Sequence, residues 1–288
     1  MNRWVRRILL GIGALLALVL VVAGVLMLVG TQRFNREYDI AAHPLPPADD
    51  SSMVHGQYLA TTRGCTECHG ANLAGTLMIN DGMFARLAAP NLTKGRGGSA
   101  ATFSDADWEK AIRHGVGQDK RTLFIMPSPE FASFSDKDVR ALITYISAQP
   151  PVDDTLPARS IGPIPRLLVG IGAPLPLGAR MIDHSAPHPS VRMEQSAAYG
   201  AHVAKLCQGC HGANLEGSTG GPTPAPALNA SGNLPRWTEE QFLTALRTGR
   251  TPEGKQLDPQ AMPWRVFGKA NDTELKALWM YLRTLHTR

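Results

Sequence analysis

The sequence predicts an all-α protein that consists of one N-terminal transmembrane helix and two tandem small helical domains. Three observations support this prediction: a long uncharged apolar run near the N-terminus, an internal repeat, and helix signals at matching places of both repeats. Sustained alternation of apolar and polar residues, which would indicate β-strands, does not occur, so we expect little β-structure.

The composition is that of an ordinary globular protein. Of the 288 residues, 43% are hydrophobic and 18% are charged, which excludes wholesale disorder. The net charge of +5 is spread along the chain without a run of like charges, so nothing indicates binding to nucleic acid. Aromatic residues make up only 6%, which is few for two independent cores unless another apolar body fills them.

The first thirty residues have the pattern of a membrane anchor. The 22 uncharged residues 8–29 would span about 33 Å as a helix, which is enough to cross a bilayer core. A cleaved signal peptide is the alternative, but its apolar core is usually only about 7–15 residues long, and no small-residue cleavage site follows before Thr31. We therefore predict a retained anchor over 1–30, with a cytoplasmic N-terminus that the arginines at positions 3, 6 and 7 favour.

Composition and repetition divide the rest of the chain. A polar, proline-rich spacer over 31–50 follows the anchor. Two similar segments, 51–150 and 190–288, are predicted to be the two domains, and a proline-rich linker over 151–189 joins them. Within the linker, residues 161–177 are apolar, so we expect them to pack as a strap across the two domains. A contact with the membrane surface or a partner is the alternative.

Five sequence blocks recur in the same order in the two segments, which indicates an internal duplication. We call residues 51–150 copy 1 and residues 190–288 copy 2. The matched blocks are 58–75 with 199–217, 89–92 with 225–228, 111–115 with 245–249, 126–127 with 262–263, and 142–146 with 278–282.

Helix signals recur within these blocks. Ser104 and Thr238 each begin a pattern typical of an N-terminal capping box, and Gly115 and Gly249 stand where the two helices would end. A last helix, with apolar residues at spacings of three and four, is predicted near the end of each copy. Each copy is therefore predicted to be a small all-α domain.

The motif Cys-x-x-Cys-His, which occurs once in each copy, predicts covalent attachment of haem c. On a helical turn, two thiols three residues apart can add to the two vinyl groups of one porphyrin, and the adjacent histidine then meets the iron. The two motifs contain all the cysteines of the chain. The predicted attachment residues and proximal iron ligands are Cys65, Cys68 and His69 in copy 1, and Cys207, Cys210 and His211 in copy 2.

Other chemistries suit this motif less well. A zinc site would need a fourth ligand that is also duplicated, and a dithiol redox motif has no use for the histidine. The predicted cofactors are therefore two haem c groups, whose porphyrins would add apolar bodies to cores with few aromatic residues. Because haem c is attached outside the bacterial cytoplasmic membrane, we expect a single-pass inner-membrane protein with both haem domains in the periplasm.

Two further pairs of residues are predicted to surround the irons. Met126 and Met262 are the predicted distal iron ligands, because each precedes a proline in a loop before the last helix at equivalent positions of the duplication. A methionine more often simply fills a core, but the matched positions favour ligation. The carbonyls of Pro90 and Pro226 are the expected acceptors for the second ring N–H of each proximal histidine.

The other histidines are not expected to bind iron. His114 and His202 have no histidine counterpart in the other copy, so we expect each to lie at the surface or to have its hydrogen bonds satisfied. His184 and His188 lie in the linker and are expected to make no contact with iron.

In this order, the motifs resemble the class I cytochrome c family. Cys-x-x-Cys-His comes first, followed by Pro-Asn-Leu at 90–92, a distal Met-Pro, and a final helix that carries Tyr145 in copy 1 and Tyr281 in copy 2. The resemblance implies, for each copy, a small bundle of helices around one haem whose edge is exposed to partners. Ala-Pro-Asn-Leu-Thr at 89–93 and the Met-Pro pairs also look like the cytochrome subunits of membrane-bound alcohol and gluconate dehydrogenases.

The predicted function is electron transfer between proteins, without catalytic residues and without a small-molecule substrate of its own. The chain would pass single electrons from a dehydrogenase or a quinol-oxidising complex to a soluble cytochrome or a terminal oxidase. It could also be the di-haem subunit of a haem–copper oxidase. A di-haem peroxidase is the enzyme alternative, but it needs one iron with an open position, and the two Met-Pro candidates disfavour it. A gas sensor would need the same open position and an output domain.

Overall fold

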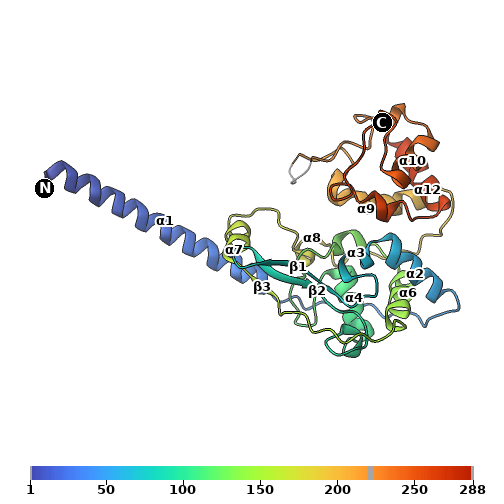
Figure 1. The fold of residues 1–288 in the computed structure, drawn as a ribbon, viewed down its shortest axis with the longest axis horizontal. Coiled ribbons are helices and arrows are strands. Elements are labelled where there is room, and N and C mark those ends of the chain that lie inside the picture. Colours follow the sequence, from blue (N-terminus) through green and yellow to red (C-terminus); the bar gives the residue numbers. More distant parts are fainter. Residues whose placement is uncertain (1, 220–223, 287–288) are drawn as a thin grey trace.

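Helix α1 (Arg3–Asn35) projects from the rest of the molecule as one long rod (Figure 1). The structure is a computed structural model that describes residues 2–219 and 224–286. Within these residues, α1 is the helix that is long and apolar enough to cross a membrane, and its apolar part is exposed. A helix of this kind is typical of a membrane anchor or of a signal peptide.

The last turns of α1 belong to the folded body. The helix continues five residues beyond the anchor predicted over 1–30, and Phe34 is only 3% exposed. Its ring lies edge-on to that of Phe124, with 5.4 Å between the centroids. Arg33 donates a hydrogen bond to the carbonyl of Val169, which lies in the linker. The base of the rod is thus fixed to both copy 1 and the linker.

Helix α7 (Pro163–Gly170) lies beside the base of α1 (Figure 1). The two helices touch through glycine: a Cβ atom added at Gly30 would overlap the backbone of Arg166, and one added at Gly170 would overlap that of Leu26. Small residues permit such close approach of helices. The apolar stretch 161–177 therefore packs against α1 and copy 1, whereas we expected a strap across both copies. The linker also contains the short helix α8 (Gly178–Met181).

Copy 1 is a bundle of helices with its core between the first, third and last of them. The helices are α2 (Ser52–Thr62), α3 (Cys65–His69), α4 (Asp105–His114), α5 (Ser128–Phe131) and α6 (Asp136–Ser147), with a 3-10 turn at Ser99–Ala101. Helix α2 crosses α6 closely because Gly56 places no side chain against the backbone of Ala141. Trp108 and Leu142 are buried in this core.

Copy 2 repeats the arrangement. Its elements are α9 (Ala197–His211), a 3-10 turn at Leu234–Arg236, α10 (Glu239–Thr248), α11 (Trp264–Phe267) and α12 (Asp272–Thr284). Helix α9 crosses α12 at Gly200, which lies against the backbone of Ala277. In copy 1 the corresponding helix breaks at Gly64, whose φ is +76°, whereas α9 runs on without a break through Cys207 to His211.

The crossings correct one detail of the sequence comparison. The repeated sequence blocks align Tyr58 with Tyr199. When the copies are aligned instead on the glycines at the helix crossings, Gly56 and Gly200, the residue that matches Tyr199 is His55. Both of these side chains contact the carboxylate at the third position of the last helix. His55 Nε2 lies 2.7 Å from Asp138 Oδ1, and the Tyr199 hydroxyl donates to Glu274 at 2.6 Å.

The predicted helix ends are confirmed. Ser104 and Thr238 each close a capping box at the N-terminus of α4 and of α10. Gly115 and Gly249 follow the last turns with left-handed φ values of 62° and 70°, which residues with a Cβ atom rarely adopt. The α-helical prediction for both copies therefore rests on correctly located starts and stops.

The small amount of β-structure that was expected lies at one side of copy 1. Strands β1 (Thr76–Asp81), β2 (Ala85–Ala89) and β3 (Ser160–Ile161) form an antiparallel sheet in the order β1-β2-β3. β3 comes from the linker, so the sheet holds the start of the linker on copy 1.

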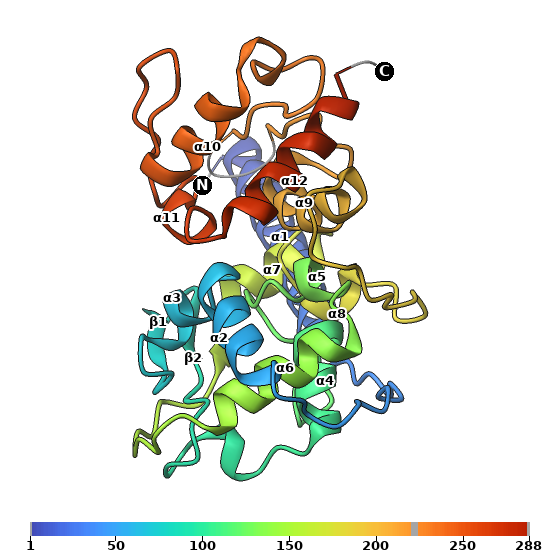
Figure 2. The same cartoon turned by 90° about the vertical axis from the view of Figure 1, so that its right-hand side faces the viewer.

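A buried ion pair joins the two copies, which lie one above the other in Figure 2. Arg63 donates two hydrogen bonds to Glu274, at 2.6 and 2.8 Å, and the two side chains are only 4% and 2% exposed. Burial alone would raise the pKa of the Glu274 carboxyl, but the Arg63 charge, with hydrogen bonds from Arg63 and Tyr199, outweighs burial and lowers it. Glu274 is therefore ionised at neutral pH. A more exposed pair, Lys269 with Glu67 at 3.2 Å, lies at the same interface.

We predict that Glu274→Gln lowers the free energy of unfolding by about 3–5 kcal/mol, because it leaves the Arg63 charge buried without a counterion. Chemical denaturation followed by circular dichroism measures this change. Asp153→Asn is the matched control, since it removes a carboxylate from an ion pair whose side chains are 80% and 60% exposed, and it should cost at most about 1 kcal/mol. Equal losses in the two variants would contradict a special role for the buried pair.

The same pair sets an acid dependence. Because the native pKa of Glu274 lies below the reference value of 4.5, its contribution is complete above that pH and is lost as the pH falls through the native value. The difference in unfolding free energy between the wild type and Glu274→Gln should therefore shrink under acid conditions.

Candidate haem-binding sites

The histidine of each Cys-x-x-Cys-His motif is held in one orientation. His69 is 9% exposed, and its Nδ1 lies 2.8 Å from the carbonyl oxygen of Pro90. In copy 2, Nδ1 of His211 lies 2.7 Å from the carbonyl oxygen of Pro226. A carbonyl only accepts hydrogen bonds, so Nδ1 carries the proton and donates it in both rings. The expected proline acceptors are confirmed.

This hydrogen bond leaves the other ring nitrogen available to a metal. With Nδ1 protonated, Nε2 of a neutral imidazole is a lone-pair donor, and it has no hydrogen-bond partner among the described residues. Burial lowers the pKa of His69 and of His211, which keeps both rings neutral near pH 7. A buried, oriented and neutral imidazole is what ligation of a haem iron requires.

The backbone after each motif is folded identically in the two copies. In copy 1, the amide of Gly75 donates to the carbonyl of His69 at 2.8 Å, and the amide of Leu92 donates to the carbonyl of Leu73 at 2.8 Å. The matching bonds of copy 2, also 2.8 Å long, are Gly217 to His211 and Leu228 to Leu215. These bonds connect the segment that carries the histidine to the segment that carries its proline acceptor.

The four cysteines are free thiols, and one of each pair is part of the core. Cys65 packs against the apolar cluster of copy 1 and Cys207 against that of copy 2. Burial raises the pKa of each of these two thiols to about 12. Neither has the low pKa of a dithiol redox centre, which disfavours thiol–disulfide exchange.

Met126 and Met262 have the same backbone setting. Each is followed by a proline at the centre of an inverse γ-turn, with φ and ψ of −80° and 49° at Pro127 and of −76° and 56° at Pro263. The residue after each proline donates to the methionine carbonyl, at 2.8 and 2.7 Å. Met126 packs on the same cluster as Cys65, and Met262 on the same cluster as Cys207. Ligation of iron by these sulfurs stays a prediction.

A strained residue precedes the first methionine, and sequence reasoning missed it. Ile125 has a φ of +76°, a region that β-branched residues rarely occupy. Its amide donates to the carbonyl of Pro176 at 3.2 Å, so the linker holds this conformation. No local signal in the sequence indicates it, because the constraint comes from a segment about fifty residues away.

The two candidate sites are adjacent because the copies exchange contacts around them. Helix α5, which follows Met126, packs on α9, where Glu130 lies against Gly209 of the second Cys-x-x-Cys-His motif. Helix α11, which follows Met262, packs on α2, where Val266 lies beside Gly64, just before Cys65. Figure 2 shows α11 next to α3, and α5 next to α9. The short helix that follows the methionine of each copy therefore lies against the cysteine motif of the other copy or directly beside it.

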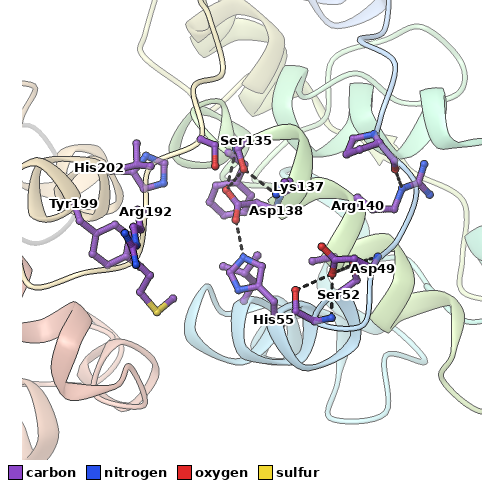
Figure 3. Close-up of a pocket in the computed structure, with 18 of the residues that line it drawn as sticks. Asp49, Ser52, His55, Ser135, Lys137, Asp138, Arg140, Arg192, Tyr199 and His202 are labelled. Carbon is purple, nitrogen blue, oxygen red and sulfur yellow. Dashed lines mark hydrogen bonds and ion pairs between the residues drawn. The ribbon is translucent and has the colours of Figure 1, made fainter.

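A cleft between the copies lies apart from the predicted haem residues. It has a volume of about 270 Å³ and is lined by residues that include His55, Arg63, Asp138 and His202, and by none of the residues predicted to hold haem (Figure 3). His202 stacks on Tyr199 beside this cleft. The buried ion pair beside the cleft, Arg63 with Glu274, could not be predicted from the sequence, because the two residues are 211 positions apart.

The residues present fit a covalently held haem in each copy. The fit rests on two buried histidines whose Nε2 atoms have no hydrogen-bond partner among the described residues, and on the free thiols of the same motifs. The cytochrome c family model matches the chain over 53–149 and again over 197–286. The chain belongs to the cytochrome c family. Covalently attached haem c follows from this membership.

Relatives of this cytochrome are subunits of dehydrogenases. It is 26% identical over 281 residues to the cytochrome c subunit of the quinone-dependent alcohol dehydrogenase of Gluconobacter oxydans, covering 85% of this chain and 57% of that one. It is 26% identical over 292 residues to the fructose dehydrogenase cytochrome subunit of Gluconobacter japonicus, covering 91% and 57%. The chain thus spans little more than half the length of these two relatives.

We predict that Gly75→Ala reduces covalent haem in copy 1. Gly75 has a φ of +93°, and a Cβ atom there would lie 2.7 Å from the amide nitrogen of Asn91 and 2.8 Å from the carbonyl oxygen of Ala89. The change would push the segment of Pro90 away from His69. Haem per chain, measured as the pyridine haemochrome, should fall towards half of the wild-type value. Gly82→Ala, with open space around the added atom, is the control and should leave it unchanged.

Proposed function

We propose that this cytochrome holds two haem c groups and passes single electrons from a dehydrogenase-side or quinol-side donor to a downstream cytochrome or terminal oxidase. The observation that carries the proposal is the duplication of the whole ligand setting, from the histidine–carbonyl hydrogen bond to the methionine–proline turn. The proposed haem-binding residues are Cys65, Cys68, His69 and Met126 in copy 1, and Cys207, Cys210, His211 and Met262 in copy 2.

Each haem supplies reversible one-electron chemistry when bound. The residues of the chain position and tune it. The cysteines fix the porphyrin covalently, and the carbonyls of Pro90 and Pro226 hold the proximal rings in one orientation. The sulfurs of Met126 and Met262 would hold the irons and keep water and other ligands from them. A soft thioether ligand favours the ferrous state and raises the reduction potential.

The contact between the copies supports transfer within the chain. The short helix after each methionine lies against the cysteine motif of the other copy or directly beside it, so the two haem-bearing segments share one interface. The buried Arg63–Glu274 pair holds that interface in one arrangement. A fixed arrangement keeps the separation of two redox centres constant, which one-electron transfer between them needs.

The names of the relatives support a dehydrogenase as the electron donor. Two of them are cytochrome subunits of an alcohol and of a fructose dehydrogenase. A further relative, 26% identical over 278 residues, is the gluconate 2-dehydrogenase cytochrome c subunit of Pantoea cypripedii. The match covers 83% of this chain and 60% of that one. The peroxidase alternative gains no support from these relatives, and both distal positions are assigned to methionine.

We further propose that α1 is retained as an anchor in the bacterial cytoplasmic membrane, with both copies in the periplasm. Removal of residues 1–30 would take away Leu26 and Gly30, whose backbone lies against Gly170 and Arg166 of α7. Helix α7 exposes the apolar side chains of Ile164 and Leu167, so it can lie at the membrane surface. This is the second role that we considered for the apolar stretch 161–177.

We predict that Met126→Ala and Met262→Ala each convert one haem into a form that binds carbon monoxide, because an open distal position results. Visible spectra of the purified holoprotein should show two low-spin haems and the weak long-wavelength methionine–iron band in the wild type, and half of that band in each variant. Met78→Ala is the control, since Met78 lies on β1 and is 40% exposed. A wild type that already binds carbon monoxide rapidly would overturn the assignment.

We predict that Gly30→Leu separates α7 from α1. A side chain at this position would overlap the backbone of Arg166, whereas Gly13→Leu adds a side chain where nothing lies within 4 Å. Limited proteolysis of the detergent-solubilised protein should cut the linker near α7 faster in Gly30→Leu than in Gly13→Leu or the wild type. Equal rates would show that the contact between α1 and α7 does not protect the linker from proteolysis. An intact mass without residues 1–30 would show that α1 is cleaved.

A further inference from the structure

Four of the nine histidines of the chain gather on one side of copy 1, and none of the four is a proposed haem ligand. His114 ends α4, His184 and His188 follow α8 in the linker, and His43 precedes α2. The ring centroid of His188 lies 5.9 Å from that of His114 and 5.3 Å from that of His43. His114 and His184 have their Nδ1 atoms 3.0 Å apart.

A chain of hydrogen bonds fixes the protons of two of these rings. Nε2 of His184 lies 3.0 Å from the carbonyl oxygen of Ala179, so this nitrogen carries a proton and donates it. In a neutral His184 ring, Nδ1 is then a lone-pair acceptor. His114 must then donate from its own Nδ1 to His184. In a neutral His114 ring, Nε2 is left as a bare lone pair.

That lone pair is buried and faces a carboxylate. His114 and Glu109 are both 0% exposed, and Nε2 lies 3.2 Å from Oε1 of Glu109 without forming a hydrogen bond. Oε1 already accepts a hydrogen bond from Arg113 Nε at 2.9 Å and lies 2.8 Å from Nη2 of the same side chain, while Oε2 of Glu109 has no partner among the described residues. Two buried electron-pair donors that face each other are unfavourable unless a proton or a metal ion lies between them.

A third donor points to the same place. Both ring nitrogens of His188 are buried, and neither makes a hydrogen bond of good geometry among the described residues, although the ring lies near the backbone of Ala132. One ligand atom each from Glu109, His114 and His188 lie within 4.8 Å of one another. Two imidazoles and a carboxylate are a ligand set suited to zinc and similar divalent ions.

We propose that Glu109, His114 and His188 bind one divalent transition-metal ion, with Zn²⁺ as the best match to the donor set. The hydrogen bonds of His184 to His114 and to Ala179 support this site, because they hold the His114 ring in the tautomer that a metal needs. The charged groups nearby are Glu109, Asp136 and Arg113, where Arg113 contacts both carboxylates. Their formal sum is −1, so a divalent cation is not opposed by a positive site.

The proposed ion would fasten the linker to copy 1. Glu109 and His114 belong to α4, whereas His188 lies in the segment that leads to copy 2. A metal bond between them would fix the point from which the chain departs towards α9. The inference is independent of haem ligation, since none of its residues is proposed to touch a haem.

Metal analysis of the purified full-length holoprotein tests the proposal. The protein is dialysed against micromolar ZnCl₂ and then against metal-free buffer, and zinc per chain is measured by mass spectrometry against amino-acid analysis. We expect about one zinc per chain in the wild type and at least a tenfold loss in His188→Ala. His202→Ala is the matched control, because it removes a histidine outside the cluster and should keep the wild-type zinc content.

Two results would overturn the proposal. One is a wild type that retains less than a tenth of an equivalent of zinc, and the other is equal retention by His188→Ala, which would mean an adventitious ion only. His188→Gln, which preserves the size of the side chain, guards against loss by misfolding and should repeat the loss of zinc with an unchanged haem spectrum. Added zinc should also raise the melting temperature of the wild type and leave that of both His188 variants unchanged.

Discussion

The glycine-mediated crossing of the first and last helices is the constraint on which each copy depends. Gly56 lets α2 approach the backbone of Ala141, and Gly200 lets α9 approach that of Ala277. Any side chain at these glycines would separate the helices and open the core between them. The crossing also brings the start of α6 or α12 to the helix that leads into the cysteine motif. The position of each proposed haem site therefore follows from a backbone contact that has no polar chemistry of its own.

The second level of order is the pairing of the copies. Duplication alone would give two domains on a tether, but a buried arginine–glutamate pair and the exchanged contacts of α5 and α11 make one body of them. Such a pair is weak as a source of net stability, because desolvation offsets much of the attraction. The pair constrains how the copies can meet, because an orientation that buries either charge without its partner is unfavourable.

The linker does more than connect. It supplies β3 to the sheet of copy 1, α7 to the base of the anchor, and Pro176 as the acceptor that holds Ile125 in its strained conformation. It also brings His188 to the carboxylate of Glu109. These contacts explain why the segment combines many prolines with apolar residues: it follows an irregular path along a surface that it must cover.

The sequence by itself determined the class of the protein. Cys-x-x-Cys-His is decisive because the chemistry of attachment fits within five consecutive residues, and the helix starts at Ser104 and Thr238 were readable because capping acts over one turn. The proline acceptors could be expected from the repeat of one short block. All of these signals are local, and each was present twice.

Only the tertiary structure decided the relations between distant segments. The Arg63–Glu274 pair joins residues 211 positions apart, and the cluster of His114, His184 and His188 joins a helix to a linker. The residue of copy 1 that corresponds to Tyr199 is His55, and this became clear only from the helix crossing. Sequence patterns record which face of an element is apolar, but not which other element covers it, because many arrangements bury the same area. Close backbone contacts and buried charge select one arrangement among these, and both exist only in the folded chain.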